Sequence, residues 1–317
     1  MVNDDAQTDG GRSIEDGSPL ATVLHNTRSA FAMVFKRQSI EQSIWEKLAF
    51  YAGIVGLLVF TLFPFYVMLL TSITSSAELY SIPFDIVPET YTLDHYSYVL
   101  LSEDFPFLTY FTNSFIVASV TSGLAVIVAT FGGYSFARLD YPGRKLIARL
   151  VLVVYLFGGI VLVVPLFRVI AALGLIDTLG SLMITYLVIV LPLSLYLLGN
   201  YFRSIPEEIE EAALVDGYSR LETIFYITLP LSAPAIVAVF LFAFIIAWND
   251  YLFASIFLDS PEKYTLIIGV EYLNVQYTRV WGRIMAASVA TSAPIIVFFL
   301  YLEKYLVEGL TTGGVEG

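Results

Sequence analysis

Six long apolar blocks run through the chain, and each is about as long as a membrane-spanning helix. The hydrocarbon core of a bilayer is about 30 Å thick, so a helix needs about 20 apolar residues to cross it. The first block, Leu48 to Leu70, contains no charged residue. The pattern predicts an all-α polytopic membrane protein with six transmembrane helices, at about residues 48–70, 110–137, 150–167, 179–201, 233–258 and 284–302.

Basic residues are distributed unevenly between the loops, and this predicts an orientation. If residues 1–47 lie inside, twelve of the 16 Lys and Arg residues fall in inner segments, with a cluster in the turn 138–145. Because Lys and Arg favour the cytoplasmic side of a membrane, we expect both termini in the cytoplasm. Residues 1–47 contain no long apolar block, and we expect a largely disordered cytoplasmic tail there. The transmembrane domain is then 48–317.

The composition supports a membrane protein and narrows its chemistry. Hydrophobic residues make up 57% and charged residues 14% of the chain, whereas soluble domains have roughly 45–50% and about 25%. With 16 basic and 28 acidic residues, no nucleic-acid partner is expected, because phosphate contacts need an excess of Lys and Arg. The chain has no Cys and only His25 and His95, which argues against disulfides, thiol catalysis and His-rich metal sites. We therefore expect neither a cofactor nor a metal.

The net charge of −12 comes from carboxylates in the tails and loops, while the apolar blocks hold almost none. An acidic water-facing surface is typical of salt-adapted proteins. We interpret the charge as a halophile-like feature of the surface rather than as an indication of the substrate.

The loop between the fourth and fifth predicted spans, residues 204–230, has the pattern of two short helices. Ser204 with Glu207 predicts a capping box for the first helix, and Asp216-Gly217 predicts its end. A second capping box is predicted from Ser219 and Glu222, and Pro230 is expected to end the second helix.

On the first predicted helix, Ile209, Ala212 and Ala213 share a face beside Glu208 and Glu211. Small residues allow close approach of another surface, so this helix is a candidate docking element on the cytoplasmic side. An ordinary connecting loop would show the same helix signals. A DNA-reading helix-turn-helix is disfavoured, because the loop together with the adjacent Arg203 has six acidic and only two basic residues.

The spacing in this loop resembles a known family. Glu211-Ala212-Ala213, Gly217, Ile227 and Leu229-Pro230 match the defining positions of the EAA loop of binding-protein-dependent ABC importer permeases. The turn 141–145, the run 248–250 and the tail 305–317 resemble the carbohydrate-uptake branch, particularly the second permease of maltose-type systems. Tyr218 and Asp250 depart from that branch, which commonly has Ala and Glu there; these departures leave the substrate open.

The resemblance implies a type I ABC importer permease in the cell membrane. A second permease would complete the pathway, two ATP-binding subunits would dock on the cytoplasmic face, and an extracellular or periplasmic binding protein would deliver a sugar. The chain has no G-x-x-x-x-G-K-[ST] phosphate loop, so ATP hydrolysis is expected in a partner. By resemblance, the coupling residues are Glu208, Glu211, Ala212, Ala213, Asp216, Gly217, Ile227, Leu229 and Pro230.

Two further sets of residues are candidates for transport. Trp248, Asn249 and Asp250 lie within an apolar block, where an ionisable residue is a functional hypothesis. The alternative is that Asp250 is hydrogen-bonded structurally near the outer interface. In the outer loop 259–283, Tyr272, Gln276 and Tyr277 are candidates for contact with the binding protein, or aromatic anchors at the interface.

Other functions stay open on the sequence alone. An ABC permease for a peptide, an amino acid or phosphate would carry the same EAA loop. A secondary transporter or a channel would need charged relays, and only Asp250 is a clear candidate. A membrane enzyme is disfavoured because neither His lies in a span and no hydrolase motif is present.

Overall fold

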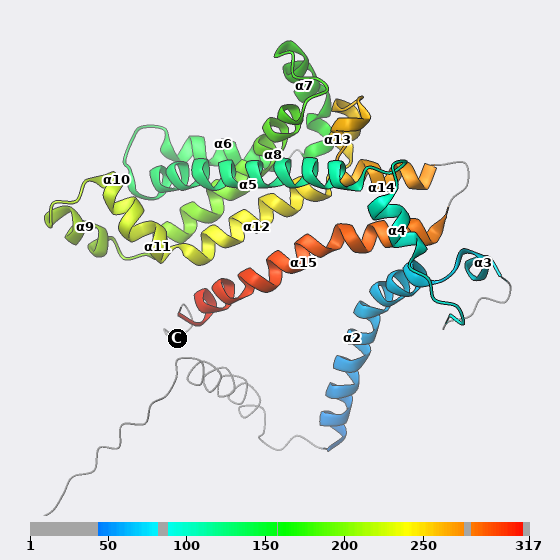
Figure 1. Ribbon diagram of the computed structural model, residues 1–317. Helices are drawn as coiled ribbons and strands as arrows, with labels where there is room; N and C mark the ends of the chain where they lie inside the picture. Colours follow the sequence, from blue (N-terminus) through cyan, green and yellow to red (C-terminus); the bar gives the residue numbers. More distant parts are fainter. Residues whose placement is uncertain (1–43, 82–87, 157, 276–279, 313–317) are drawn as a thin grey trace, which may run out of the picture. The chain divides into compact units, whose positions relative to one another are not determined.

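A computed structural model describes residues 44–81, 88–156, 158–275 and 280–312 (Figure 1). Within these ranges the secondary structure is helical, and the only β pairing is an isolated bridge between Thr74 and Tyr91. The predicted disordered tail lies largely outside the described residues, since only its last four residues, 44–47, are described. These four are helical and belong to the beginning of α2, and the tail boundary at residue 47 stays a prediction.

The chain divides into two units between Pro64 and Phe65. The described part of the first unit is the beginning of helix α2, which runs from Ile44 to Ile73. Its apolar side chains are exposed along the whole stretch from Ile44 to Phe63. A helix that is apolar on every side is suited to a lipid environment, as the first apolar block predicts.

The second unit contains the end of α2 and all later helices. They are α3 (Ser76–Leu79), α4 (Asp94–Leu101), α5 (Phe107–Arg138), α6 (Arg144–Leu156), α7 (Gly158–Ala172), α8 (Leu179–Ser204), α9 (Glu207–Val215), α10 (Arg220–Thr223), the π-helix η1 (Ile224–Thr228), α11 (Leu229–Leu231), α12 (Ala233–Asn249), α13 (Leu252–Phe257), the 3-10 helix η2 (Pro261–Lys263), α14 (Leu266–Val275) and α15 (Trp281–Thr312).

Four described helices are long and apolar enough to cross a membrane: Lys47–Ile73, Phe107–Arg138, Leu179–Ser204 and Trp281–Leu302. They correspond to the first, second, fourth and sixth predicted spans. Two bent helix pairs also qualify if each is counted as one span, which gives up to six.

The third predicted span, 150–167, is not one straight helix. It falls on α6 and α7, which are bent by 100° relative to each other. Gly158, the first residue of α7, has a φ of +69°. This left-handed conformation is accessible to Gly at low cost and is incompatible with a continuous α-helix.

The fifth predicted span, 233–258, is also interrupted. Helix α12 ends at Asn249, the backbone of Asp250 is extended, and α13 begins at Leu252. At its other end α12 forms a bent pair with the segment Arg220–Leu231, at an angle of 81°. The apolar pattern therefore located the segment correctly and missed its interruption at Asp250, whereas the bend before Ala233 lies at the start of the predicted span.

Helix α5 packs mainly against α8 and α12, and these helices lie side by side in Figure 1. Between α5 and α8 the backbones come close at two glycines: a Cβ atom on Gly133 would lie 3.0 Å from the backbone nitrogen of Gly199. Small residues of this kind allow close helix packing in membranes. An aromatic cluster lies between α5, α12 and α15, where the rings of Phe244 and Phe298 are 4.8 Å apart, edge to face.

Hydrogen bonds define two ends of the bundle. Arg138, at the end of α5, donates to the carbonyl of Ile205, which follows α8. We call this the coupling end, with residues 204–231. Near the start of α5, Asn113 donates to the carbonyls of Glu262 and Tyr264. We call this the opposite end, with residues 173–178 and 258–266. Helices α5 and α8 therefore run parallel.

Candidate functional site

The predicted coupling loop forms the two expected helical segments, α9 and the run α10–η1–α11. The first begins differently from the prediction, because α8 extends to Ser204 and the Ser204 hydroxyl donates to the Tyr201 carbonyl at 2.7 Å. Pro206 is the N-cap of α9 and provides no side-chain cap. The predicted Ser204–Glu207 capping box is therefore wrong, since the backbone of Ser204 is already part of the preceding helix.

Helix α9 ends as the sequence predicts. Gly217 has a φ of +96°, in the left-handed region. The Tyr218 amide donates to the Ala213 carbonyl at 3.0 Å, and the Gly217 amide donates to the Leu214 carbonyl at 3.2 Å. These two bonds form a Schellman motif, which needs a residue that tolerates positive φ. Asp216 is the exposed C-cap.

The second predicted capping box is confirmed. The Ser219 amide donates to Glu222 Oε2 at 2.7 Å, and the Glu222 amide donates to Ser219 Oγ at 3.3 Å. Beyond α10 the helix widens into the π-helix η1. The following Pro230 lacks an amide hydrogen and crowds the preceding turn, which gives a physical reason for this widening.

Pro230 does not end the helical run, contrary to the prediction. The run continues to Leu231, and the chain bends at Ser232 before α12. Pro230 is accommodated within the run because the widened turn of η1 precedes it. Ile227 and Leu229 are half-buried, and Pro230 is exposed.

The side chains of α9 divide into an outer and an inner face. Glu208, Glu211 and Ala212 are exposed, as a docking surface requires. Ala213 is buried within the chain, so the prediction that it contacts a partner directly is wrong. Its position brings α9 close to its own bundle. Exposed apolar side chains enlarge the outer surface of the loop: Ile209, Val215, Tyr218, Leu221, Phe225 and Tyr226.

The inner face of α9 contains a buried carboxylate that sequence reasoning missed. Glu210 Oε1 accepts from Arg138 Nε at 3.1 Å, and its Oε2 accepts from the Tyr134 hydroxyl at 2.9 Å. Thr228 of η1 donates to Oε1 at 3.3 Å. The side chains of Glu210 and Arg138 are each 6% exposed. This network, which we call the Glu210 cluster, connects α9 to α5 and to the helical run that leads into α12.

The sequence contained a signal for the part of the Glu210 cluster that lies on α5. Tyr134 and Arg138 are four residues apart on α5, so their side chains share a face. Nothing local distinguished Glu210 from its neighbours Glu207, Glu208 and Glu211, because the four carboxylates lie close together on the same half of the predicted helix.

The run 248–250 is held by contacts within the chain. Trp248 is 1% exposed, its ring stacks on Phe244 at 5.5 Å, and its Nε1 donates to the Thr291 carbonyl at 3.2 Å. The prediction that Trp248 lines a pathway is therefore wrong; it is a core residue. Asn249 is exposed, and its side-chain amide donates to the Ile245 carbonyl at 2.9 Å.

Asp250 is a structural acceptor at the break between α12 and α13. Its Oδ1 accepts from the Tyr186 hydroxyl at 2.8 Å and from the amides of Phe253 and Ala254 at 2.9 and 3.3 Å. A carboxylate that accepts from amides in the first turn stabilises the start of a helix. These bonds agree with the structural alternative, and a role of Asn249 or Asp250 in the pathway stays a prediction.

A second acidic residue, Asp177, organises the opposite end. Its carboxylate accepts from the Asp259 and Ser260 amides, both at 3.0 Å, from the Ser260 hydroxyl at 2.6 Å and from Lys263 Nζ at 2.7 Å. Lys263 and Ser260 lower the pKa of Asp177 well below its usual range. Asp177 adopts a φ of +57°. We call these contacts the Asp177 clamp.

The Asp177 clamp holds the segment that leads into α14, the helix that carries Tyr272. The Tyr272 side chain is exposed, which leaves it available for contact with a partner. Gln276 and Tyr277 lie outside the described residues. In the described residues, no group of three or more His, Cys, Asp and Glu side chains could hold a metal ion.

Comparisons with known proteins identify the relatives of this chain. The model of the family described as "Binding-protein-dependent transport system inner membrane component" matches residues 125–311. The inner membrane ABC transporter permease protein YcjP of Escherichia coli is 44% identical over 272 residues, which cover 86% of this chain and 97% of that protein. The trehalose/maltose transport system permease protein MalG of Thermococcus litoralis is 34% identical, with coverage of 88% and 100%.

A similar fold is found among solved structures. A chain of a bacterial ABC transporter involved in the import of the acidic polysaccharide alginate superimposes with a TM-score of 0.71. The match covers 84% of this chain and 99% of that chain, at 22% sequence identity. At this identity the likeness concerns the fold.

Proposed function

The chain belongs to the family of binding-protein-dependent transport system inner membrane components, and on this premise we propose that it is a permease subunit of an ATP-driven sugar importer. It forms half of the translocation pathway, together with a second permease. A separate pair of ATP-binding subunits hydrolyses ATP, and an extracellular or periplasmic binding protein delivers the sugar. The sugar assignment is supported by the trehalose/maltose relative.

The observation that carries this proposal is the two-sided construction of α9. Its outer face presents Glu208, Glu211 and Ala212 to a partner. Its inner face is tied by Glu210 to Arg138 at the end of α5. A helix that only connected two spans would not need a buried ion pair to a third one.

The mechanism follows from these connections. The ATP-binding subunit binds the outer face of α9, and closure of the two ATP-binding subunits moves α9 as a rigid body. The Glu210 cluster passes this movement to α5, and the run α10–η1–α11 passes it to α12. Because α5, α8 and α12 pack closely, they move together between two packing arrangements, as in rocking-type transporters.

Gly217 sets the angle between the two helices of the loop, and no other atom would contact a Cβ placed on it. A β-branched residue there disturbs the backbone at a cost of about 1–3 kcal/mol, without a steric clash. Asn249 and Asp250 are proposed as pathway residues, and Tyr272, Gln276 and Tyr277 as contacts for the binding protein.

The test reconstitutes the importer in proteoliposomes with its binding protein and compares Gly217→Val with Gly174→Val. Gly174 also has a positive φ, of +68°, and open space at its Cβ, but it lies at the opposite end. Uptake of radiolabelled maltose or trehalose and ATP hydrolysis are measured together. We expect Gly217→Val to lose uptake per ATP hydrolysed and Gly174→Val to keep it. Equal coupling in both variants, or uptake of an amino acid and no sugar by the unmodified importer, would overturn the proposal.

A further inference from the structure

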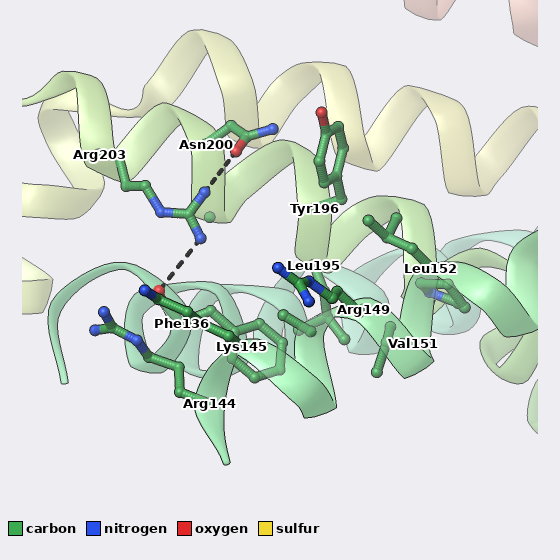
Figure 2. A pocket seen from close by; sticks show the side chains of 13 residues that line it. Phe136, Arg144, Lys145, Arg149, Val151, Leu152, Leu195, Tyr196, Asn200 and Arg203 are labelled. Atoms are coloured by element: carbon green, nitrogen blue, oxygen red, sulfur yellow. Dashed lines mark hydrogen bonds between the residues drawn. The ribbon is translucent and has the colours of Figure 1, made fainter. Parts of the chain in front are cut away.

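A cavity of about 310 Å³ lies between α6 and α8 near the coupling end, outside the coupling loop. One wall is formed by α6 and the other by the C-terminal half of α8, which Figure 2 shows facing each other. The lining includes four basic residues and no acidic one: Arg144, Lys145, Arg149 and Arg203. This is a concentration of positive charge in a chain whose net charge is −12.

Most of this charge is not compensated. Arg144 forms an ion pair with Asp140 at 3.0 Å. Among the residues that the structure describes, no acidic side chain pairs with the other three cations of the cavity: Lys145, Arg149 and Arg203.

Arg203 is oriented by neutral acceptors. Its guanidinium donates to Asn200 Oδ1 at 2.7 Å and to the Phe136 carbonyl at 3.3 Å, the two dashed bonds in Figure 2. These bonds fix the position of the group and leave its charge available to an anion. Tyr196 lies one turn before Asn200 on the same helix and lines the same cavity.

The rest of the lining is apolar and extends along the helices away from the coupling end. On α6 it consists of Val151 and Leu152, about two turns after Arg144, and on α8 of Pro192 and Leu195. A ligand that satisfies both parts has an anionic group at one end and a hydrocarbon body at the other. A free anion or an acidic protein surface would satisfy the cations and leave the apolar wall uncovered.

We propose that this cavity binds an anionic phospholipid of the inner leaflet. Its phosphate lies among Lys145, Arg149 and Arg203, and its acyl chains lie along the apolar wall. Basic pockets between membrane helices on the cytoplasmic side are suited to such headgroups. The inference rests on the proposed function only in placing the coupling end at the cytoplasmic face. A bound lipid bridges α6 to α8 next to the coupling loop.

The test measures lipid binding to the purified full chain, alone and in the assembled importer, by native mass spectrometry in detergent. The probes are dioleoyl phosphatidylglycerol, dioleoyl phosphatidylcholine and inorganic phosphate. The variant Lys145→Gln/Arg149→Gln removes two exposed cations of the cavity. The control Lys47→Gln/Arg168→Gln removes two basic charges elsewhere, and Lys145→Arg/Arg149→Lys keeps the charge.

We expect phosphatidylglycerol to bind in preference to phosphatidylcholine, and the double Gln variant to bind it roughly tenfold more weakly. The control and the charge-keeping variant should bind normally. Equal binding by the double Gln variant, equal affinity for phosphatidylcholine, or displacement of the lipid by millimolar phosphate would overturn the proposal. Loss of the lipid on assembly would assign the cavity to a protein partner instead. Because binding is measured without transport, failure of ATP-coupled uptake would not affect this result.

Discussion

The two ends of the helical bundle each hold a loop with an ion pair, and the two pairs differ in environment. At the coupling end, Arg138 and Glu210 lie 3.1 Å apart, and each side chain is 6% exposed. At the opposite end, Lys263 and Asp177 lie 2.7 Å apart, and their side chains are 38% and 24% exposed. The shorter pair is the more exposed one, so distance alone does not rank the two.

The difference in burial indicates that the coupling end resists deformation more than the opposite end. Breaking a buried pair leaves an uncompensated charge in a medium of low dielectric constant, whereas an exposed partner is resolvated by water. The Glu210 cluster therefore connects α9 firmly to α5, as the proposed coupling would require. The Asp177 clamp positions a loop. Most of the hydrogen bonds that the Asp177 carboxylate accepts are donated by the Asp259 and Ser260 amides and by the Ser260 hydroxyl.

The largest effect is expected from Glu210→Ala. This change leaves the Arg138 guanidinium buried without its carboxylate, at a cost of about 3–5 kcal/mol in the free energy of unfolding. Thermal unfolding in detergent measures the loss, and uptake assays should show that ATP hydrolysis no longer drives import. The double variant Arg138→Met/Glu210→Leu should recover most of the stability, because it leaves no unpaired charge. A single and a double variant of equal stability would contradict this account.

The next effect in size tests the close contact of α5 and α8 near the coupling end. Gly133→Ala places a Cβ atom 3.0 Å from the Gly199 nitrogen, and we expect a loss of about 1–3 kcal/mol from overpacking. Gly123→Ala on the same helix is the control, since nothing lies within 4 Å of its added Cβ. If both variants unfold at the same temperature, the backbone contact at Gly133 does not limit packing.

A smaller, pH-dependent effect is expected at the opposite end. Because Lys263 and Ser260 lower the pKa of Asp177 in the folded chain, its stabilising contribution is fully present above the unfolded value of about 3.9. The contribution is lost as the pH falls from there through the folded pKa. The protection of the Asp259 and Ser260 amides against hydrogen exchange, corrected for the intrinsic pH dependence of exchange, should therefore fall below pH 4. Asp177→Asn should exchange faster at neutral pH and lose this extra acid sensitivity.

The smallest effect is expected from Glu207→Ala, which removes the second carboxylate near Arg138. Glu207 lies 3.4 Å from the guanidinium, and its side chain is 68% exposed. Exposed pairs contribute about 0–1 kcal/mol, so its unfolding temperature should stay close to that of the unmodified chain. A loss as large as that of Glu210→Ala would show that burial does not separate the two carboxylates.

Several features of the fold were predictable because neighbouring residues determine them. Gly217 was expected to accept a left-handed backbone, and Ser219 and Glu222 to form a capping box; both are confirmed. The apolar blocks also located the long helices to within a few residues. The family resemblance from the EAA loop is confirmed by the family match. In each case the signal lies within a turn or two of helix, or within one continuous block.

Other features depended on contacts between distant segments. Helix α8 extends further than predicted and includes Ser204. The break between α12 and α13 at Asp250 is stabilised by a hydrogen bond from the Tyr186 hydroxyl, 64 residues away in the sequence. Trp248 was predicted to line the pathway, but it lies in the core, where its indole donates to the Thr291 carbonyl of α15.

The sequence by itself determined the membrane class, the long helices, the end of α9 and the family. Only the tertiary structure decided which carboxylate of α9 faces inward and which alanine is buried. The physical reason is that the local pattern places Ile209, Ala212 and Ala213 on one face, whereas the face that is buried in the bundle carries Glu210 and Ala213. The orientation is set by Arg138 and Tyr134, which α5 brings to it from 72 and 76 residues away in the sequence.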